Sequence, residues 1–319
     1  MSGLAARRSR ELAAGAVVLA LVAGAGLWWV LRSEEQGCAR VRGDGRIKAV
    51  LGGGWRSDLS CGELGEKLRA VVVGVRPGVH TVAQAEAMRT VVVVLGEGTV
   101  VAPELRGPLA AALADYAADT HEVLTEINEV YNGHAGRDGV WQDGNGVHLS
   151  VYRRDLLHVL RGLAEDPSGY AALRAADLRL AAAGVASIGP EAPDVEIVSR
   201  LVLAAAPAGA FDGIADDVLR GRDRSVAQAW KGEVLRRLKE SDPDDRAAAA
   251  WLDGITPADP DGADGFPRLG GQVPALFGAR VAAVRPDLTP EAADRFEDRA
   301  RQTAARERQE VPEVLGRGR

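Results

Sequence analysis

The chain has 319 residues, of which 46% are hydrophobic and 26% charged, and its formal net charge is −6. About 280 residues follow an apolar N-terminal segment, which is enough for one large or two small domains with a hydrophobic core. A mildly acidic chain without a basic stripe argues against a nucleic-acid-binding protein and against broad affinity for anionic lipid.

The first predicted element is a transmembrane helix over residues 12–31, which follows a short tail, residues 1–11. Its sequence, LAAGAVVLALVAGAGLWWVL, contains no charged side chain. As a helix this segment is about 30 Å long, the thickness of the hydrocarbon core of a bilayer. Trp28 and Trp29 end the apolar run, where amphipathic aromatic rings prefer the headgroup boundary. We therefore predict that the chain contacts the membrane through residues 12–31.

A cleaved signal peptide is the alternative, because Ala23-Gly24-Ala25 has the small residues of a cleavage site. The apolar run continues past this site to Leu31, which favours an uncleaved signal anchor. The flanking Lys and Arg residues do not by themselves set the direction of insertion. A short tail before a first apolar helix is typical of a signal anchor, so we expect a single-pass cell-membrane protein with a cytoplasmic N-terminus and an extracytoplasmic C-terminal domain.

The chain has two cysteines, Cys38 and Cys61. Outside the cytoplasm a disulfide between them is the natural pairing, with two unpaired thiols as the alternative. The bond closes a loop of about 24 residues and stabilises the fold by roughly 3 kcal/mol in the chain-entropy model. It would tie the Gly-rich juxtamembrane linker, residues 32–59, to the folded domain. This pairing also makes more sense if the domain is extracytoplasmic.

A main helical domain is predicted over residues 60–254. Ser60 with Glu63, and Thr81 with Gln84, have the spacing of capping boxes that begin helices. Short valine runs near these helices are equally compatible with buried strands. The predicted fold is therefore mainly α, an N-terminal single transmembrane helix followed by a multi-helix soluble domain. It leaves open a small two-stranded element near residues 47–51 or 71–101.

The strongest helical pattern runs from Pro103 to Tyr131, where large apolar residues recur every three or four positions. We predict one helix about 43 Å long that forms the spine of the domain. Residues 132–149 follow as a long loop rich in Gly, Asn and Asp. Loops longer than about 12 residues inside a compact domain are often functional.

Further helices are predicted at residues 151–164, 168–183, 194–206, 211–219, 225–238, 243–251 and 272–284. We expect Pro207 to end one of them. An acidic, turn-rich connector at 255–267 separates the main domain from a C-terminal helical extension, residues 255–319. In that extension Thr289 caps a last helix that is polar nearly all round, so we expect it to pack weakly or to reach for a partner.

Chemistry-bearing side chains gather at the long loop. Imidazole and carboxylate groups from one loop can supply a general base or bind Zn²⁺. The candidate catalytic residues are His134, Asp138, Asp143 and His148. The candidate metal ligands are His134, His148 and His158, the last from the following helix. These residues match no motif of defined spacing, and the alternative is a solvated loop whose Asp and Asn side chains cap turns. No cofactor is predicted.

Neither a nucleophile-elbow motif nor a phosphate-binding loop is present in the sequence. We therefore expect a non-enzymatic binding or scaffold module, held at the outer face of a bacterial cytoplasmic membrane, whose partner is another envelope or secreted protein. The alternative is an extracytoplasmic hydrolase for cell-wall or peptide material, with its site in the 132–158 region.

Overall fold

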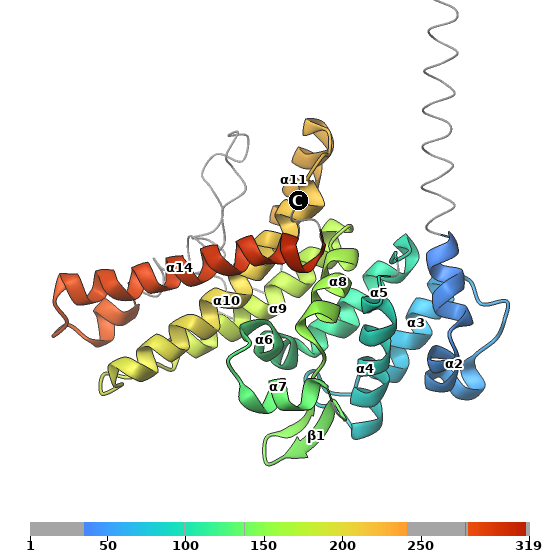
Figure 1. Cartoon of the computed structure of the whole chain (residues 1–319), viewed down its shortest axis with the longest axis horizontal. Coiled ribbons are helices and arrows are strands. Elements are labelled where there is room, and N and C mark those ends of the chain that lie inside the picture. The colour runs from blue at the N-terminus through green and yellow to red at the C-terminus, as the bar shows by residue number, and fades with distance from the viewer. Residues whose placement is uncertain (1–34, 99, 137, 241–277, 279, 317–319) are drawn as a thin grey trace, which may run out of the picture.

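The computed structural model describes residues 35–98, 100–136, 138–240, 278 and 280–316. In this part of the chain the protein is mainly helical, with one two-stranded antiparallel sheet (Figure 1). The mainly α prediction is therefore confirmed. The predicted transmembrane helix at 12–31, the helix at 243–251 and the connector at 255–267 lie outside the described residues.

The region predicted as a linker is helical over most of its described length, with residues 55–59 outside any helix. Residues 35–43 are helical, and α2 (Gly45–Leu51) and the 3₁₀ turn η1 (Gly52–Gly54) follow. The strand considered at 47–51 is wrong, because the Asp44 carboxylate caps α2 through the Arg46 N–H. Ile47 and Leu51, four residues apart, are both buried on one helical face. Cys38 and Cys61 are placed as a disulfide with Cα atoms 5.9 Å apart, as predicted.

Both predicted capping boxes are present. Ser60 and Glu63 begin α3 (Cys61–Val72), and Thr81 and Gln84 begin α4 (Val82–Gly96). The strands considered within 71–101 are wrong, because the valine run 91–94 belongs to α4. This helix is buried over most of its length, so it is apolar most of the way round. A short stretch of such a helix cannot be distinguished from a buried strand by its periodicity.

The predicted spine helix of residues 103–131 is wrong, since the segment forms three helices, α5 (Pro103–Asp115), α6 (Ala117–Thr125) and α7 (Glu129–Ala135). At the first break the Tyr116 hydroxyl donates to the Val72 carbonyl at 2.7 Å, and its ring stacks on His80. At the second break Glu126 has φ 54°, a left-handed conformation that ends α6. Long-range contacts and one backbone reversal therefore interrupt a continuous apolar stripe.

The predicted long loop is also wrong, because it contains the end of α7 and a β-hairpin. Strand β1 (Val140–Asp143) pairs with β2 (Gly146–Leu149) in an antiparallel register. The two-residue turn between them is stabilised by the Asp143 carboxylate, which accepts from the Asn145 N–H at 2.7 Å. The sheet therefore lies here rather than near 47–51 or 71–101. The hairpin packs against α4 through both strands.

The remaining helices enclose the core. The elements are α8 (Arg153–Leu163), α9 (Pro167–Ala186), α10 (Asp194–Leu219), α11 (Arg224–Glu240) and α14 (Pro290–Val314). Helix α9 is central and contacts α5, α6, α10 and α11. Pro207 lies inside α10, so the predicted break there is wrong. The residues around Pro207 are buried, and this burial outweighs the cost of about 3 kcal/mol of a proline within a helix.

Helix α14 lies closely along α10 rather than packing weakly as expected (Figure 1). A Cβ atom at Gly209 would lie 2.2 Å from the Ala304 carbonyl oxygen, and one at Gly213 would lie 2.8 Å from the Val311 Cβ. The two glycines therefore allow the helices to approach, and they show that α10 and α14 run parallel. The predicted Thr289 cap is present, accepting from the Ala292 N–H. The buried face of α14 is made largely of small residues, so a sequence pattern based on large apolar side chains does not predict this packing.

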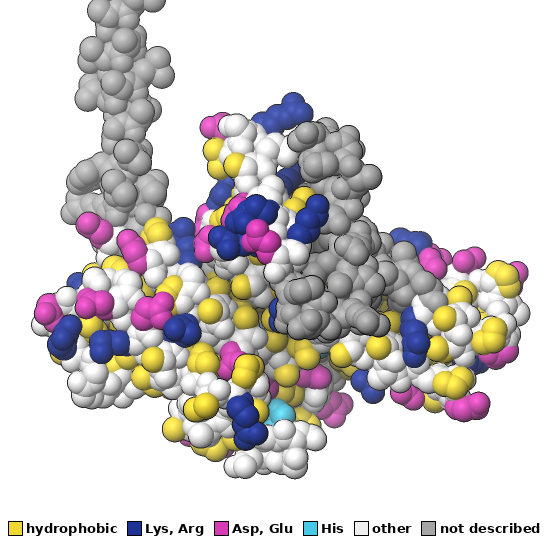
Figure 2. Space-filling model, turned by 180° about the vertical axis from the view of Figure 1, so that it is seen from behind, with side chains coloured by type: hydrophobic (Ala, Val, Ile, Leu, Met, Phe, Trp, Pro, Cys, Tyr) yellow, Lys and Arg dark blue, Asp and Glu magenta, His cyan; other side chains and the backbone are white. Residues whose placement is uncertain are grey.

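Among the described helices, α10 is long and apolar enough to cross a membrane, and 72% of its most apolar stretch is buried in the protein. Such burial is typical of the core helix of a folded domain. On the face seen in Figure 2, acidic and basic side chains are interspersed, with hydrophobic side chains between them.

Candidate functional site

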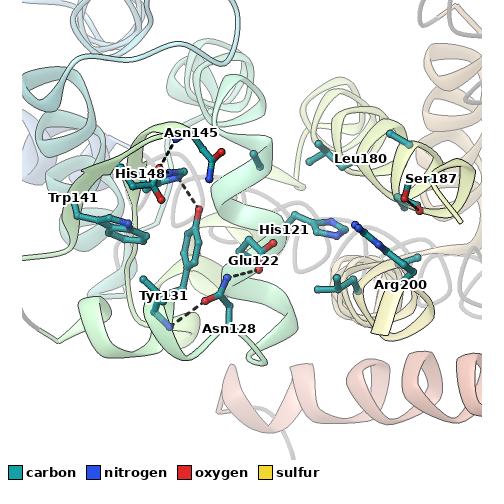
Figure 3. A pocket seen from close by; sticks show the side chains of 18 residues that line it. His121, Glu122, Asn128, Tyr131, Trp141, Asn145, His148, Leu180, Ser187 and Arg200 are labelled. Carbon is teal, nitrogen blue, oxygen red and sulfur yellow. Dashed lines mark hydrogen bonds and ion pairs between the residues drawn. The ribbon is translucent and has the colours of Figure 1, made fainter. Parts of the chain in front are cut away.

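A pocket of about 600 Å³ lies between α6, α7, the β1–β2 hairpin, α9 and α10 (Figure 3). Apolar side chains form much of its wall, among them Val130, Trp141, Leu180 and Leu203. Polar and charged groups lie at both ends of the pocket. One end is beside the hairpin, and the other is next to α9 and α10. This combination of apolar walls and a few placed polar groups is typical of ligand sites, and its volume is in their usual range.

At the hairpin end, four polar side chains form one network. His148 of β2 places Nε2 3.0 Å from the Asp143 carboxylate and Nδ1 3.2 Å from the Tyr131 hydroxyl. That hydroxyl donates to the Asp119 carboxylate at 2.6 Å. Trp141 stacks on His148, with ring centroids 5.2 Å apart. The imidazole is therefore held in one orientation by a carboxylate, a phenol and an indole.

The two carboxyl groups of this network have opposite electrostatic environments. Burial raises the pKa of Asp119, against the lowering effect of the hydrogen bond from Tyr131. The backbone N–H of Asn145 and then His148 lower the pKa of the exposed Asp143. Burial also raises the pKa of the Tyr131 hydroxyl, so this group stays a hydrogen-bond donor at neutral pH. Asp143 is therefore the carboxylate that carries charge at the pocket surface.

At the other end, α6 and α9 bring together a buried ionic chain. The Nδ1 atom of His121 lies 2.7 Å from the Asp177 carboxylate, and both side chains are buried. Arg174, which is fully buried, lies 3.7 Å from the same carboxylate and donates to the Ala208 carbonyl at 3.3 Å. His121 lines the pocket, so this chain connects the interior of the domain to the pocket wall.

Arg200 of α10 completes this end of the pocket. Its guanidinium and the His121 ring point toward one another in Figure 3. Arg200 is half-buried, and within the described part of the chain it makes neither an ion pair nor a hydrogen bond. A cationic fork without a partner inside a pocket is a binding group for an anion.

The rim next to α7 is apolar and tightly turned. Ile127 and Val130 are 50% and 54% exposed, and Val130 also lines the pocket. Between α6 and α7 the left-handed Glu126 is held by the Asn132 side chain, which donates to its carbonyl at 2.9 Å. A non-glycine residue in this conformation costs of order 1–3 kcal/mol, and such residues cluster at functional sites.

The predicted site residues are only partly brought together. Asp143 and His148 line the pocket and interact, whereas His134 stacks on Trp141 at 4.3 Å without lining the pocket. Asp138 is exposed in the turn before β1, and His158 belongs to α8, away from the pocket lining. In the described ranges no three His, Cys, Asp or Glu side chains are arranged to hold a metal ion, so the structure gives no support for metal binding by the three predicted histidines.

Sequence reasoning missed His121, Asp177, Arg174 and Arg200 as site residues. One signal was available: Arg174 and Asp177 are charged residues three positions apart in a helix otherwise rich in Ala and Leu. Charged residues are rarely buried unless they are paired, so such a pair in an apolar helix predicts a buried ion pair. The contact of Asp177 with His121, 56 residues earlier in the chain, had no such signal.

Comparison with known proteins finds no family model that matches this chain, no similar curated protein and no similar solved structure.

Proposed function

We propose that the chain is a single-pass membrane protein whose extracytoplasmic helical domain binds a segment of another envelope or secreted protein. The pocket between α6–α7, the hairpin and α9–α10 is the binding site in this proposal. The anchor is the uncharged segment 12–31, and Cys38, seven positions beyond it, joins the membrane-proximal chain to α3. The domain would then stand close to the membrane surface.

The observation that carries this proposal is the apolar rim of the pocket. Exposed apolar side chains beside a concave site, here Ile127 and Val130, mark surfaces that another molecule covers. Leu180 and Leu203 add further apolar side chains to the lining of the pocket. An extended or helical segment laid across α7 can place one apolar side chain into the pocket, which is the arrangement of an anchor residue at a protein interface.

Site-specific photo-crosslinking in native membranes tests this proposal. A photoreactive amino acid at Val130 or Asn145, both in the pocket lining, should form a discrete protein adduct. The same group at Val226, an equally exposed apolar position on α11, should not. The Leu203→Trp variant fills the pocket and should abolish the adducts at both pocket positions. Adducts of equal yield at all three positions, or adducts that survive Leu203→Trp, would overturn the proposal.

The topology is tested by labelling the cysteines of intact cells with a membrane-impermeant maleimide. If the domain is extracytoplasmic and the pair oxidised, Cys38 and Cys61 should react only after treatment with a reductant that spares the membrane. A chain that reacts only after cell lysis has its domain in the cytoplasm. A chain that reacts without reductant is extracytoplasmic and has unpaired thiols.

A second candidate is an extracytoplasmic hydrolase of cell-wall or peptide material, favoured by the orientation of His148 between Asp143 and Tyr131. In this candidate Asp143 holds Nε2 of the imidazole, and Nδ1 would exchange its contact with the Tyr131 hydroxyl for a water molecule and act as the general base. The hydroxyl of Ser150, next to β2, is buried and donates to the Tyr131 carbonyl, so water rather than this serine would be the nucleophile. Release of products from cell-wall fragments should fall about 100-fold or more in His148→Gln. Equal product release by the wild type and by this variant excludes the candidate.

A further inference from the structure

We propose that the pocket binds a carboxylate group attached to an apolar body, with the carboxylate between His121 and Arg200. The inference rests on the proposed function, since the carboxylate would belong to the bound segment of the partner. It adds the chemical class of the ligand and the two residues that select it. A carboxylate can come from a chain terminus, an acidic side chain or a free acid, and the experiment below separates these sources.

Arg200 supplies a cationic group to the pocket. Its half-buried side chain lies in the pocket lining, and among the described residues no carboxylate or carbonyl engages its guanidinium. None of its nitrogen atoms is fully buried, so the guanidinium is open to a ligand that enters the pocket. A guanidinium presents donors in a planar fork that matches a carboxylate in two hydrogen bonds. An incoming carboxylate would therefore supply a partner for this guanidinium, which has none among the described residues.

The ring of His121 is held in one orientation at the pocket wall. The carboxylate of Asp177 accepts from Nδ1, so Nε2 is the ring nitrogen that a ligand in the pocket can contact. Nε2 donates to a ligand carboxylate when the ring is doubly protonated, and two carboxylates on one imidazole favour that form. The ring points toward Arg200, so the two side chains converge on one position (Figure 3). The charge of Asp177 does not repel an incoming carboxylate strongly, because Arg174 lies 3.7 Å from it and balances that charge.

The other charged groups and the apolar wall of the pocket also suit an anionic ligand. The two acidic residues of the pocket lining are already engaged, Glu122 by Asn128 at 3.1 Å and Asp143 by His148 at 3.0 Å. The wall next to Arg200 is apolar and includes Leu203. A ligand with an anionic end and an apolar body therefore meets complementary groups at both parts.

The probes are short peptides titrated by calorimetry into the full chain purified in detergent. Acetyl-Ala-Ala-Leu with a free carboxylate should bind at least tenfold more tightly than the same peptide with a C-terminal amide. Acetyl-Asp-Ala-Leu amide tests a side-chain carboxylate, and 4-methylpentanoate tests a free acid. The tightest of the three carboxylates identifies the source. Equal affinity of the free-acid and amide peptides, or no binding of any carboxylate, overturns the inference.

Variants assign the two residues. Arg200→Gln should weaken binding of the best carboxylate at least tenfold and leave binding of the amide unchanged. His121→Asn keeps a donor toward Asp177 and removes Nε2, so it should weaken binding of the carboxylate probe while preserving the fold. Arg154→Gln removes the same charge from an exposed arginine that does not line the pocket, and should change neither affinity. If Arg200→Gln behaves like Arg154→Gln, the inference is wrong. Crosslinking at Val130 stands independently of this result, so the two proposals fail separately.

Discussion

The substitution Asp177→Asn isolates the charge of one buried carboxylate. Asparagine has nearly the same shape, and its side-chain oxygen can still accept from the Nδ1–H of His121. What changes is the electrostatic balance of Arg174, because Asp177 is the ion-pair partner of this arginine within the described part of the chain. The variant therefore leaves a guanidinium buried without a counter-charge.

The expected loss of stability follows from the burial of Arg174. This side chain is fully buried, and its other contacts are one hydrogen bond to the Ala208 carbonyl at 3.3 Å and the ring of Phe211, 5.3 Å from Cζ. Two of its nitrogen atoms, Nε and Nη2, have no hydrogen-bond partner in the described structure. Removing one partner of a buried ion pair costs about 3–5 kcal/mol. For a domain of this size the melting temperature should fall by about 6–20 °C.

The assay is thermal and urea-induced unfolding of the purified chain, followed by circular dichroism. Asp298→Asn is the matched control, because it removes an exposed carboxylate 2.5 Å from Arg301 and should change stability by less than about 0.5 kcal/mol. The double variant Arg174→Met with Asp177→Asn removes both charges and should recover at least about 2 kcal/mol of the loss. A loss below about 1 kcal/mol in Asp177→Asn would refute the reasoning, since Arg174 would then not depend on this carboxylate.

Three further predictions concern packing, titration and covalent stability. Gly209→Ala should loosen α14 and raise amide hydrogen exchange over residues 290–314, because its Cβ would lie 2.2 Å from a carbonyl oxygen of that helix. Burial raises the folded-state pKa of Asp119 above its ordinary 3.8, so the folded state binds this proton more tightly. Stability should then fall as pH rises from about 4 through the folded-state pKa, and Asp119→Asn should remove this component from urea midpoints measured across pH. Replacing Cys38 and Cys61 with Ser should cost roughly 3 kcal/mol in the same measurement.

Each of these predictions has a control or an opposing result. Gly232→Ala adds the same methyl group in open space on α11, and should leave exchange in α14 unchanged and stabilise its own helix by up to about 1 kcal/mol. If the urea midpoints of Asp119→Asn and of the wild type change with pH in parallel, titration of the buried Asp119 carboxyl does not contribute to the stability of the fold. Equal urea midpoints for the double Ser variant and the oxidised chain would show that the disulfide does not stabilise the fold.

The helix starts were predictable because their signals are local. The Ser60–Glu63 and Thr81–Gln84 capping boxes each lie within one turn, and both are present in the structure. The hairpin was missed, although its signal is also local. The turn sequence Asp143-Gly144-Asn145-Gly146 stands between two short apolar runs, which is the pattern of a hairpin. His148 and Asp143 were two of the four candidate catalytic residues because all four lie in one short segment of the sequence. In each case the interacting groups are close in the sequence.

By itself, the sequence determined the mainly helical class, the starts of most helices and the pairing of the two cysteines. The tertiary structure decided the rest. Contacts of Tyr116 with the distant Val72 interrupt an apolar stripe that reads as one helix, and burial keeps α10 continuous through Pro207. The pocket likewise depends on His121, Asp177 and Arg200, which come from three different helices. The physical reason is that helix propensity and capping act within a few residues, whereas packing joins groups from anywhere in the chain.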